Sequence, residues 1–253
     1  MSIVDVLYDE DRNKNSANDF FPGVTVGVVT DIDDPEGLGR LKVRLVNRDA
    51  SNYETEYIRV MTPMTGQKWG SFFFPEVGDE VLVAFNQGDI NRPYVLGSLW
   101  NKNYKPPTTI KDQKNDIRMI KTRSGHEIIF NDKEEEESLE IKTPQGKSVK
   151  MDDKEDTIVI TDQEGKNILT IDTKNGKIDV EAEKKMTLKS GDSSIILDAE
   201  KNSISVESSA SLNIKSNQIA ISGKSTLEVS AGSSLVNKCD GPTTIKGATV
   251  KIN

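Results

Sequence analysis

The stretch from Lys177 to Val229 reads KIDVEAEKKMTLKSGDSSIILDAEKNSISVESSASLNIKSNQIAISGKSTLEV. An apolar pair at positions i and i+2 recurs along this stretch. The pairs are Ile178 and Val180, Met186 and Leu188, Ile195 and Leu197, Ile204 and Val206, Leu212 and Ile214, Ile219 and Ile221, and Leu227 and Val229. Their first members follow one another after 8, 9, 9, 8, 7 and 8 residues, so each unit predicts one short strand and a tight polar turn.

A repeat of this length supplies only one face of a solenoid. A solenoid built by a single chain needs roughly 20 residues or more per coil to enclose an apolar interior. Three chains wound together need only one short strand each per level. We therefore predict an all-β, three-chain interwound β-helix, a homotrimer whose core holds the seven apolar pairs. Because these pairs would be exposed in a monomer, we expect folding and assembly to be coupled.

Composition narrows the possible functions and compartments. The chain has 253 residues, a formal charge of -8 and a pI near 4.9, which disfavours nucleic acid as a partner. Its single cysteine, Cys239, excludes a disulfide framework within the chain. The first residues, MSIVDVLYDEDRNK, lack the basic and apolar regions of a signal peptide, and no apolar run reaches the length of a membrane span. We expect synthesis in the cytoplasm without a signal peptide.

Aromatic residues divide the chain into two parts. All seven Phe, all five Tyr and both Trp lie at or before Phe130. Large rings suit the core of a globular domain, whereas the aliphatic and small residues of 131–253 suit a narrow interior. We expect four segments: an N-terminal arm or linker (1–22), an OB-fold domain (23–105), a neck of short β-hairpins (106–183), and a trimeric β-helix spike with its tip (184–253).

The OB-fold prediction depends on five strands separated by turn residues. The expected strands are Val24 to Ile32, Gly39 to Asn47, Tyr57 to Pro63, Asp79 to Phe85 and Pro93 to Trp100. The connection DDPEGLG places Pro35 in a turn and Gly37 and Gly39 where a positive φ is needed, which predicts a hairpin. Five such strands indicate a small closed barrel. In the neck, Gln145-Gly146, Glu164-Gly165 and Asn175-Gly176 mark turns, and Asn175-Gly176 predicts a type I′ turn.

Several runs of the first half form a recognisable series. They are the run from Asp33 to Arg44, Ile58 to Val60 with Thr62 to Met64, Phe74 to Phe85, Gly88-Asp89, Arg92-Pro93, Val95 to Trp100, and Lys121 to Ile128. Together these runs resemble the phage baseplate assembly protein V and VgrG family of central spike proteins. The runs occur in the order of the family and cover most of residues 22–130.

The resemblance implies the central spike of a contractile injection particle, such as a phage tail, a tailocin or a type VI-like system, which pierces a target envelope. VgrG proteins carry a large hub domain before the barrel. Since only about 22 residues precede the barrel here, we expect a separate baseplate hub protein, with further contacts to baseplate and inner tube components. Some relatives hold iron at the apex through a His-x-His motif. This chain has one histidine, well before the tip, so we expect neither a metal nor a cofactor.

The C-terminal end of the chain predicts a docking platform. The regular spacing of the apolar pairs ends near Leu235. Gly241-Pro242 is expected to form a turn, and the chain is expected to end in a strand that contains Val250, Ile252 and Asn253. Unpaired backbone groups at such an end favour a cap. The resemblance implies a PAAR-like tip protein, and the alternative is an end that closes on itself.

Other residues each have two interpretations. Trp69 and Phe72 to Phe74 form either a partner-facing patch or part of the barrel core. The apolar residues Ile3, Val6 and Leu7, together with Trp69, are candidates for hub docking, and the alternative for the arm is a frayed terminus.

His126 at a threefold axis could bind a metal, but a structural role is favoured. For Cys239 a buried apolar role is favoured over reactivity. Asp31, Asp33, Asp34 and Glu36 lack calcium-loop spacing and predict a solvated hairpin.

Catalysis has little support in the sequence. One histidine and one cysteine, without a nucleophile elbow, do not suggest a nucleophilic catalyst. Two alternatives remain open beside the spike. One is a trimeric tail fibre or adhesin, which would carry an aromatic C-terminal head, and the other is a β-helical polysaccharide-degrading enzyme, which would carry aromatic sugar platforms. The second half of the chain has neither feature.

Overall fold

The computed structural model describes residues 23–46 and 53–252, and its regular elements there are strands apart from one short 3-10 turn, η2 (Asn86–Gly88). The strands of the first part are β1 (Val24–Asp31), β2 (Arg40–Leu45), β3 (Ile58–Val60), β4 (Thr65–Gly66), β5 (Trp69–Gly70), β6 (Glu80–Phe85) and β7 (Pro93–Ser98). The chain forms two compact units, and the boundary between them lies between Ile158 and Val159.

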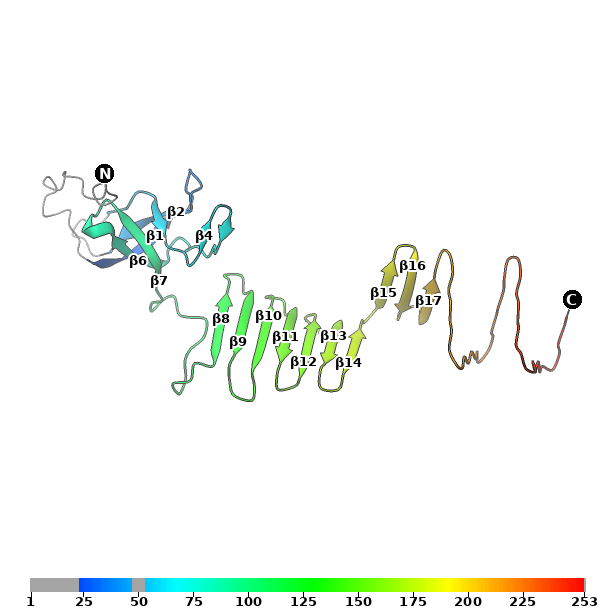
Figure 1. The fold of residues 1–253 in the computed structure, drawn as a ribbon. Coiled ribbons are helices and arrows are strands. Elements are labelled where there is room, and N and C mark those ends of the chain that lie inside the picture. Colours follow the sequence, from blue (N-terminus) through cyan, green and yellow to red (C-terminus); the bar gives the residue numbers. More distant parts are fainter. Residues whose placement is uncertain (1–22, 47–52, 253) are drawn as a thin grey trace, which may run out of the picture. The chain divides into compact units, whose positions relative to one another are not determined.

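Five of these strands close into a barrel in the order β1-β2-β3-β7-β6, with β6 returning to β1 (Figure 1). All neighbours are antiparallel except β3 and β7, which run parallel. Buried and more accessible positions alternate along β2 and β6, as expected where one face of a strand lines a core. The five predicted strands and the OB-type barrel are confirmed, with strand ends that differ by a few residues.

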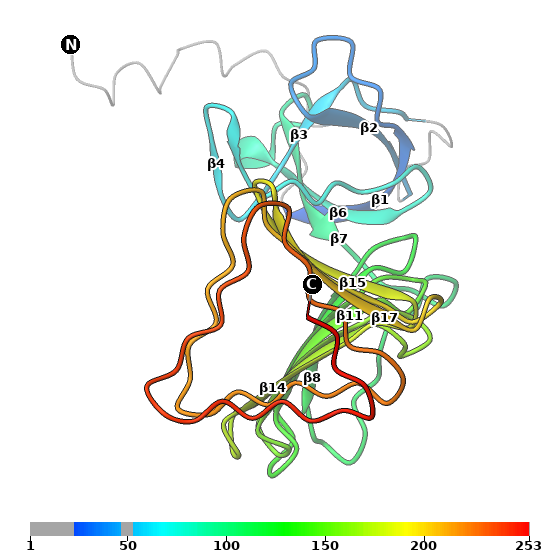
Figure 2. The same ribbon diagram turned by 90° about the vertical axis from the view of Figure 1, so that its right-hand side faces the viewer.

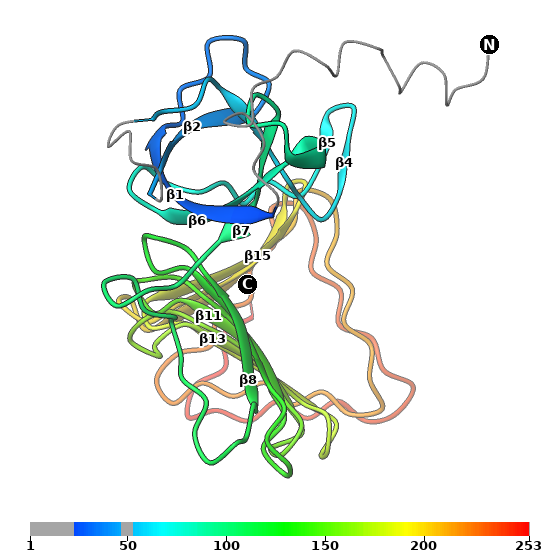
Figure 3. The same ribbon diagram turned by 90° about the vertical axis from the view of Figure 1, so that its left-hand side faces the viewer.

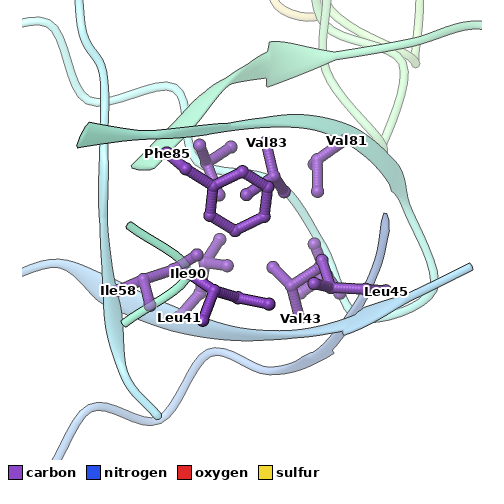
Figure 4. Packing of buried hydrophobic residues seen from close by; sticks show 10 residues of the cluster. Leu41, Val43, Leu45, Ile58, Val81, Val83, Phe85 and Ile90 are labelled. Atoms are coloured by element: carbon purple, nitrogen blue, oxygen red, sulfur yellow. The ribbon is translucent and has the colours of Figure 1, made fainter. Parts of the chain in front are cut away.

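The barrel interior holds the hydrophobic core of the described chain (Figure 4). The buried hydrophobic residues are Val29, Leu41, Val43, Leu45, Ile58, Val81, Val83, Phe85, Ile90 and Val95. Tyr53, Val60 and Phe74 pack against them while remaining partly accessible. Most members are aliphatic and come from alternate positions of the strands, so the core is narrow and is filled from every side of the barrel.

The neck is an antiparallel sheet in which strand follows strand in sequence order (Figure 1). Its strands are β8 (Ile117–Lys121), β9 (Glu127–Asn131), β10 (Ser138–Lys142), β11 (Ser148–Asp152), β12 (Thr157–Thr161), β13 (Ile168–Asp172) and β14 (Lys177–Glu181). Gly146, Gly165 and Gly176 have positive φ values, between 64° and 80°, at three of the turns. The predicted chain of hairpins is therefore present.

The turn between β13 and β14 differs from the expected type I′. Asp172 and Lys177 are paired, so four residues rather than two connect the strands, and only Gly176 among them has a positive φ. The backbone N–H of Asn175 donates to Oδ1 of Asp172 at 2.8 Å, and its side-chain amide donates to Oδ2 at 2.8 Å. These hydrogen bonds hold Asn175 in a longer loop, which the dipeptide alone did not reveal.

Antiparallel pairing continues beyond the neck through β15 (Lys185–Ser190), β16 (Ser193–Asp198) and β17 (Ser203–Glu207). From Ser208 to Ile252 the described chain contains no strand, and its residues are exposed. Figure 2 draws this last segment, coloured orange to red, as loops without strand arrows. No helix in the described ranges has the length and apolar character needed to cross a membrane.

Candidate assembly surfaces

The loop between β1 and β2 is organised around the carboxylate of Asp34. Its Oδ2 accepts hydrogen bonds from the backbone N–H of Leu38 at 2.9 Å and from Nε of Arg40 at 3.0 Å. Its Oδ1 accepts from Nη2 of Arg40 at 2.7 Å and from the N–H of Glu36 at 3.1 Å. These bonds to Arg40 hold the pKa of Asp34 well below its ordinary value. The loop is the exposed hairpin expected, and within it the Asp34 carboxylate is withdrawn from solvent by Arg40.

Tyr57 supports the same loop from the side of β3. Its hydroxyl donates to Oδ2 of Asp31 at 2.6 Å, and this bond raises the pKa of Tyr57 to about 12 and lowers that of Asp31. The ring lies under two cations, with Nζ of Lys42 4.8 Å and the guanidinium carbon of Arg40 5.9 Å from its centre. The loop therefore emerges from the barrel in a defined conformation, with Leu38 exposed near its end.

A hairpin made by β4 and β5 lies beside the barrel (Figure 3). Ser71 N–H donates to the Met64 carbonyl at 2.9 Å, and the Thr62 hydroxyl donates to the Ser71 carbonyl at 2.7 Å. The Trp69 indole lies against Gly66, where a Cβ would overlap the ring. Glycine at position 66 is therefore required for this packing, and the hairpin holds Trp69 in one place.

This hairpin and its flanks carry an exposed apolar patch, here called the aromatic patch. Its members are Met61, Met64, Trp69, Phe72 and Phe73. Trp69 and Phe72 are 61% and 81% exposed, and Phe72 stacks on Phe74 with ring centres 5.6 Å apart. The expectation that these rings fill the barrel core is wrong for Trp69, Phe72 and Phe73, and holds only for Phe74. Ile3, Val6 and Leu7, the other hub-docking candidates, lie outside the described residues.

Within each of the two sheets, β8–β14 and β15–β17, the paired strands bring apolar residues into register on one face. Leu139 lies opposite Phe130 and Met151, and Ile141 lies opposite Ile128 and Val149. Beyond the neck the predicted pairs meet in the same way, with Met186 opposite Leu197, Leu188 opposite Ile195, Ile195 opposite Val206, and Leu197 opposite Ile204. Directly opposed residues share a face of a sheet, so these side chains form an apolar face two residues wide.

The opposite face of the neck is mixed, because charged residues lie there beside Ile117, Met119 and Ile129. Glu127 lies across from Lys121 and from Lys142, and its Oε atoms are 2.7 Å and 3.2 Å from their Nζ atoms. These two lysines lower the pKa of Glu127. On the next strand, Glu140 pairs with Lys150. Ion-paired residues suit a surface in water, whereas the face of Leu139 and Ile141 carries mainly apolar side chains and has the greater need of cover.

In a single chain the apolar face has no cover. Among the described residues, every buried hydrophobic side chain lies between Val29 and Val95. Ile178 and Ile204, both on the apolar face, are 69% and 74% exposed. A hollow of about 570 Å³ at the break between β14 and β15 has a mixed lining. Its apolar side chains include Val180, Met186, Leu197 and Ile204, and its polar ones are Glu181, Lys184, Asp198, Asn202 and Ser203.

The remaining candidates are spread along the chain. Leu212, Ile214, Ile219, Ile221, Leu227, Val229, Val250 and Ile252 are exposed in the segment without strands, and Asn253 lies outside the described residues. Cys239 is also exposed, not buried as expected, and its Sγ lies 2.7 Å from the Gly241 carbonyl oxygen. His126 closes the turn before β9 through its backbone, which matches the structural role expected. No cluster of three potential metal ligands occurs in the described ranges.

Comparison with known proteins identifies the barrel. Residues 25–100 match the family described as the type VI secretion system/phage-baseplate injector OB domain. The chain is 30% identical to the type VI secretion system spike protein VgrG1b of Pseudomonas aeruginosa over 128 residues, which are 46% of this chain and 17% of VgrG1b. It is 33% identical to VgrG1a of the same species over 114 residues, 41% of this chain and 18% of VgrG1a.

A third relative is the spike protein VgrG3 of Vibrio cholerae, 29% identical over 111 residues, which are 41% of this chain and 11% of VgrG3. The chain thus spans less than a fifth of the length of each of these three relatives. The matched part contains the barrel, with its ordered loop and aromatic patch.

Proposed function

Because residues 25–100 are an injector OB domain of the baseplate and VgrG type, we propose that this chain is a structural central spike of a contractile injection particle. Its relatives are named spike proteins of secretion systems, which supports a role in a secretion or phage-tail particle and fits a structural, non-enzymatic function. Piercing of a target envelope would then be done by the part of the chain that follows the barrel.

One observation carries this proposal: the apolar faces of the sheets β8–β14 and β15–β17 are uncovered in the single chain. Exposed apolar faces of this kind are unstable in water and mark assembly surfaces. Three copies that turn these faces toward a common axis would bury them, while the opposite faces, with their charged residues, remain in solvent. The seven predicted pairs from Ile178 to Val229 then form a shared interior.

The last segment supports the same arrangement. From Ser208 to Ile252 the backbone has no strand partner in its own chain, although the apolar pairs continue at Leu212, Ile219 and Leu227. Backbone amides and carbonyls in an apolar surrounding need hydrogen-bond partners. Strands of two further copies would supply them, so we place the interwound part of the shaft here.

The two ends of the spike would contact other components of the particle. At the barrel, Trp69 lies in the exposed aromatic patch, and together with Ile3, Val6 and Leu7 it is proposed to dock on a baseplate hub protein. At the other end, Val250, Ile252 and Asn253 are proposed to receive a PAAR-like tip protein. Exposed apolar rings next to uncharged residues are typical of protein interfaces, which supports the first of these contacts.

The decisive experiment is the mass of the full chain in solution by light scattering, followed by a test of its resistance to heat and detergent. The spike model requires a particle of three copies of the 28.0 kDa chain that resists dissociation. A stable folded monomer would refute it, because the apolar face would then have no cover. A trimer that binds a cell surface but no baseplate component would instead support a tail fibre.

A further inference from the structure

The connections between consecutive strands from β8 to β17 share one backbone feature. Every connection that joins two hydrogen-bonded neighbours contains one residue with a φ between 50° and 92°. A left-handed residue of this kind lets a short connection reverse the chain, so that the next strand returns beside the one before it. These residues are Gly125, Glu135, Gly146, Asp156, Gly165, Gly176, Gly191 and Asn202.

Within 117–207, one connection lacks a left-handed residue. It is 182–184, between β14 and β15, and these two strands belong to different sheets. The correlation therefore holds in both directions, because each reversal pairs the strands that it joins and the connection without a reversal does not. A left-handed residue marks where this chain folds back on itself.

The segment after β17 follows the second pattern throughout. From Ser203 to Ile252 no residue has a positive φ, glycines included. The backbone still bends once per repeat, and successive bends begin seven or eight residues apart. The chain thus turns a corner between one apolar pair and the next without reversing. The bends lie at Ser209-Ala210, Asn217, Lys224-Ser225, Gly232-Ser233, Asp240-Gly241 and Ala248.

Repeated corners without reversal carry a chain around an axis, and three repeats complete one turn of a three-sided shaft. In a shaft built by one chain, each strand pairs with the strand one full turn further on. The structure has no such pairing between Ser208 and Ile252, and these residues are exposed. The space beside each repeat is therefore left for strands of other chains.

Further copies of this chain fit that space. They have the same repeat length and the same bends, so their strands match at every level of the shaft. Strand β17 marks where such pairing begins, because it is paired with β16 on one side and forms the edge of its sheet on the other. An uncovered edge is a template for pairing with another chain.

We propose that β17 and each apolar stretch after it pair with the next stretch of a neighbouring copy, in parallel orientation. The stretch around Asn213 in one copy then lies beside the stretch around Ala220 in the second copy, and that one lies beside the stretch around Glu228 in the third. The orientation is parallel because copies related by a threefold axis wind in the same sense. This inference rests on the proposed trimer and adds which strands pair and where hairpins end.

Disulfide formation distinguishes this arrangement from a continued series of hairpins. Asn213 and Ala220 are the middle residues of consecutive apolar pairs, so they are opposed whether the stretches pair within one copy or between copies. In a Cys239→Ser background, N213C with A220C therefore reports which copy the partner belongs to. The proposal requires linked molecules of up to three copies of the 28.0 kDa chain under denaturing conditions without reductant. A single copy with an internal disulfide overturns it.

The hairpin of β16 and β17 supplies the matched control. Ile196 and Ser205 are opposed in it, so I196C with S205C should form a disulfide within one copy and leave the denatured mass at 28.0 kDa. N213C alone and A220C alone place their three thiols on three different faces and should link no copies. The proposal is also overturned if N213C with A220C forms no disulfide while the control pair does.

The mass of the Cys239→Ser chain in light scattering separates this inference from the proposed function. A trimer in which N213C and A220C join only within single copies refutes the pairing between copies and leaves the trimeric spike intact. A monomer refutes both.

Discussion

The guanidinium of Arg40 makes two hydrogen bonds to the carboxylate of Asp34, from Nε to Oδ2 at 3.0 Å and from Nη2 to Oδ1 at 2.7 Å. The same carboxylate accepts backbone N–H groups of the loop, so one ion pair connects the end of the turn to the start of β2. A bidentate pair of this type fixes geometry as well as contributing energy.

Replacing Asp34 with asparagine should therefore loosen the loop and lower the melting temperature of the barrel by several degrees. Because the folded pKa of Asp34 is depressed, its contribution is present above the ordinary value of 3.8 and is lost as the pH falls below it. The difference between wild type and Asp34→Asn should shrink in acid. Thermal unfolding followed by tryptophan fluorescence at neutral and acidic pH measures this. Asp33→Asn, at an exposed neighbour, should change little, and equal effects of the two variants would contradict the prediction.

The hydrogen bond from Tyr57 to Asp31 predicts that the barrel loses stability at alkaline pH. The folded pKa of Tyr57 is about 12, raised from 10.0 by the hydrogen bond to Asp31, so its stabilising contribution is complete below pH 10 and lost as the pH rises toward 12. Tyr57→Phe should lack this alkaline step, and unfolding at a series of pH values will show whether it does. Tyr94→Phe removes the hydroxyl that accepts a hydrogen bond from Arg59 at 2.7 Å and should retain the step.

Leu38 and Leu41 are close in sequence, and they allow the effect of truncating an exposed leucine to be compared with that of truncating a buried one. Leu41 is 0% exposed in the barrel core, whereas Leu38 is 64% exposed on the loop. Leu41→Ala should lower the free energy of unfolding of the barrel by about 3 kcal/mol. Leu38→Ala should change it by less than about 0.5 kcal/mol. Denaturant unfolding measured on both variants tests the assignment, which fails if their effects are similar.

Gly66 is required by the position of Trp69. A methyl group at residue 66 would overlap the indole, so Gly66→Ala should displace the ring and change its emission spectrum while the barrel remains folded. Thr65→Ala, at the neighbouring exposed position of β4, should leave the spectrum of Trp69 unchanged. An unaltered spectrum in Gly66→Ala would show that the ring does not lie against the glycine.

Adjacent positions of β17 test the assembly face. Val206 belongs to the apolar face, opposite Ile195, whereas Ser205 points to the other side of the strand and pairs with Ile196. Val206→Asp would place a carboxylate in the proposed trimer interior and should abolish the trimer or destabilise it by several kcal/mol. Ser205→Asp should leave the mass in light scattering unchanged. Trimers of equal stability in both variants would place the interface elsewhere.

The barrel could be predicted from the sequence because the signals for its strands and turns lie within short stretches of the chain. Alternation in RLKVRL and EVLVAF, together with Gly37 and Gly39 at φ values of 63° and 69°, defines strands and turns within a few residues of each other. The Asp34 and Arg40 pair was missed, because an acidic loop sequence does not show which carboxylate is withdrawn from solvent. The sequence also did not decide whether Trp69 is exposed, since an aromatic ring next to a strand fits either a core or a surface.

For the shaft, the sequence predicts the strands but not which surfaces cover their apolar faces. The pairs from Ile178 to Val206 were found by their spacing, and the structure pairs their strands within one chain, a register that the spacing did not predict. Their place in a three-chain interior stays a prediction. Cys239 was expected to be buried because cysteine usually is, although a residue in a segment without strands has nothing in its own chain to cover it. Interactions between copies are not specified by the conformation of one copy.

The regular strand order within β8–β14 and within β15–β17 has an evolutionary consequence. Each strand with its turn carries its own apolar pair and contacts mainly the strands on either side, so duplication or loss of a hairpin preserves the pattern on both faces. Each strand gained or lost changes the stack by about 4.8 Å. The reach of such a protein is therefore a quantity that selection can adjust in small, equal steps without redesigning its interior.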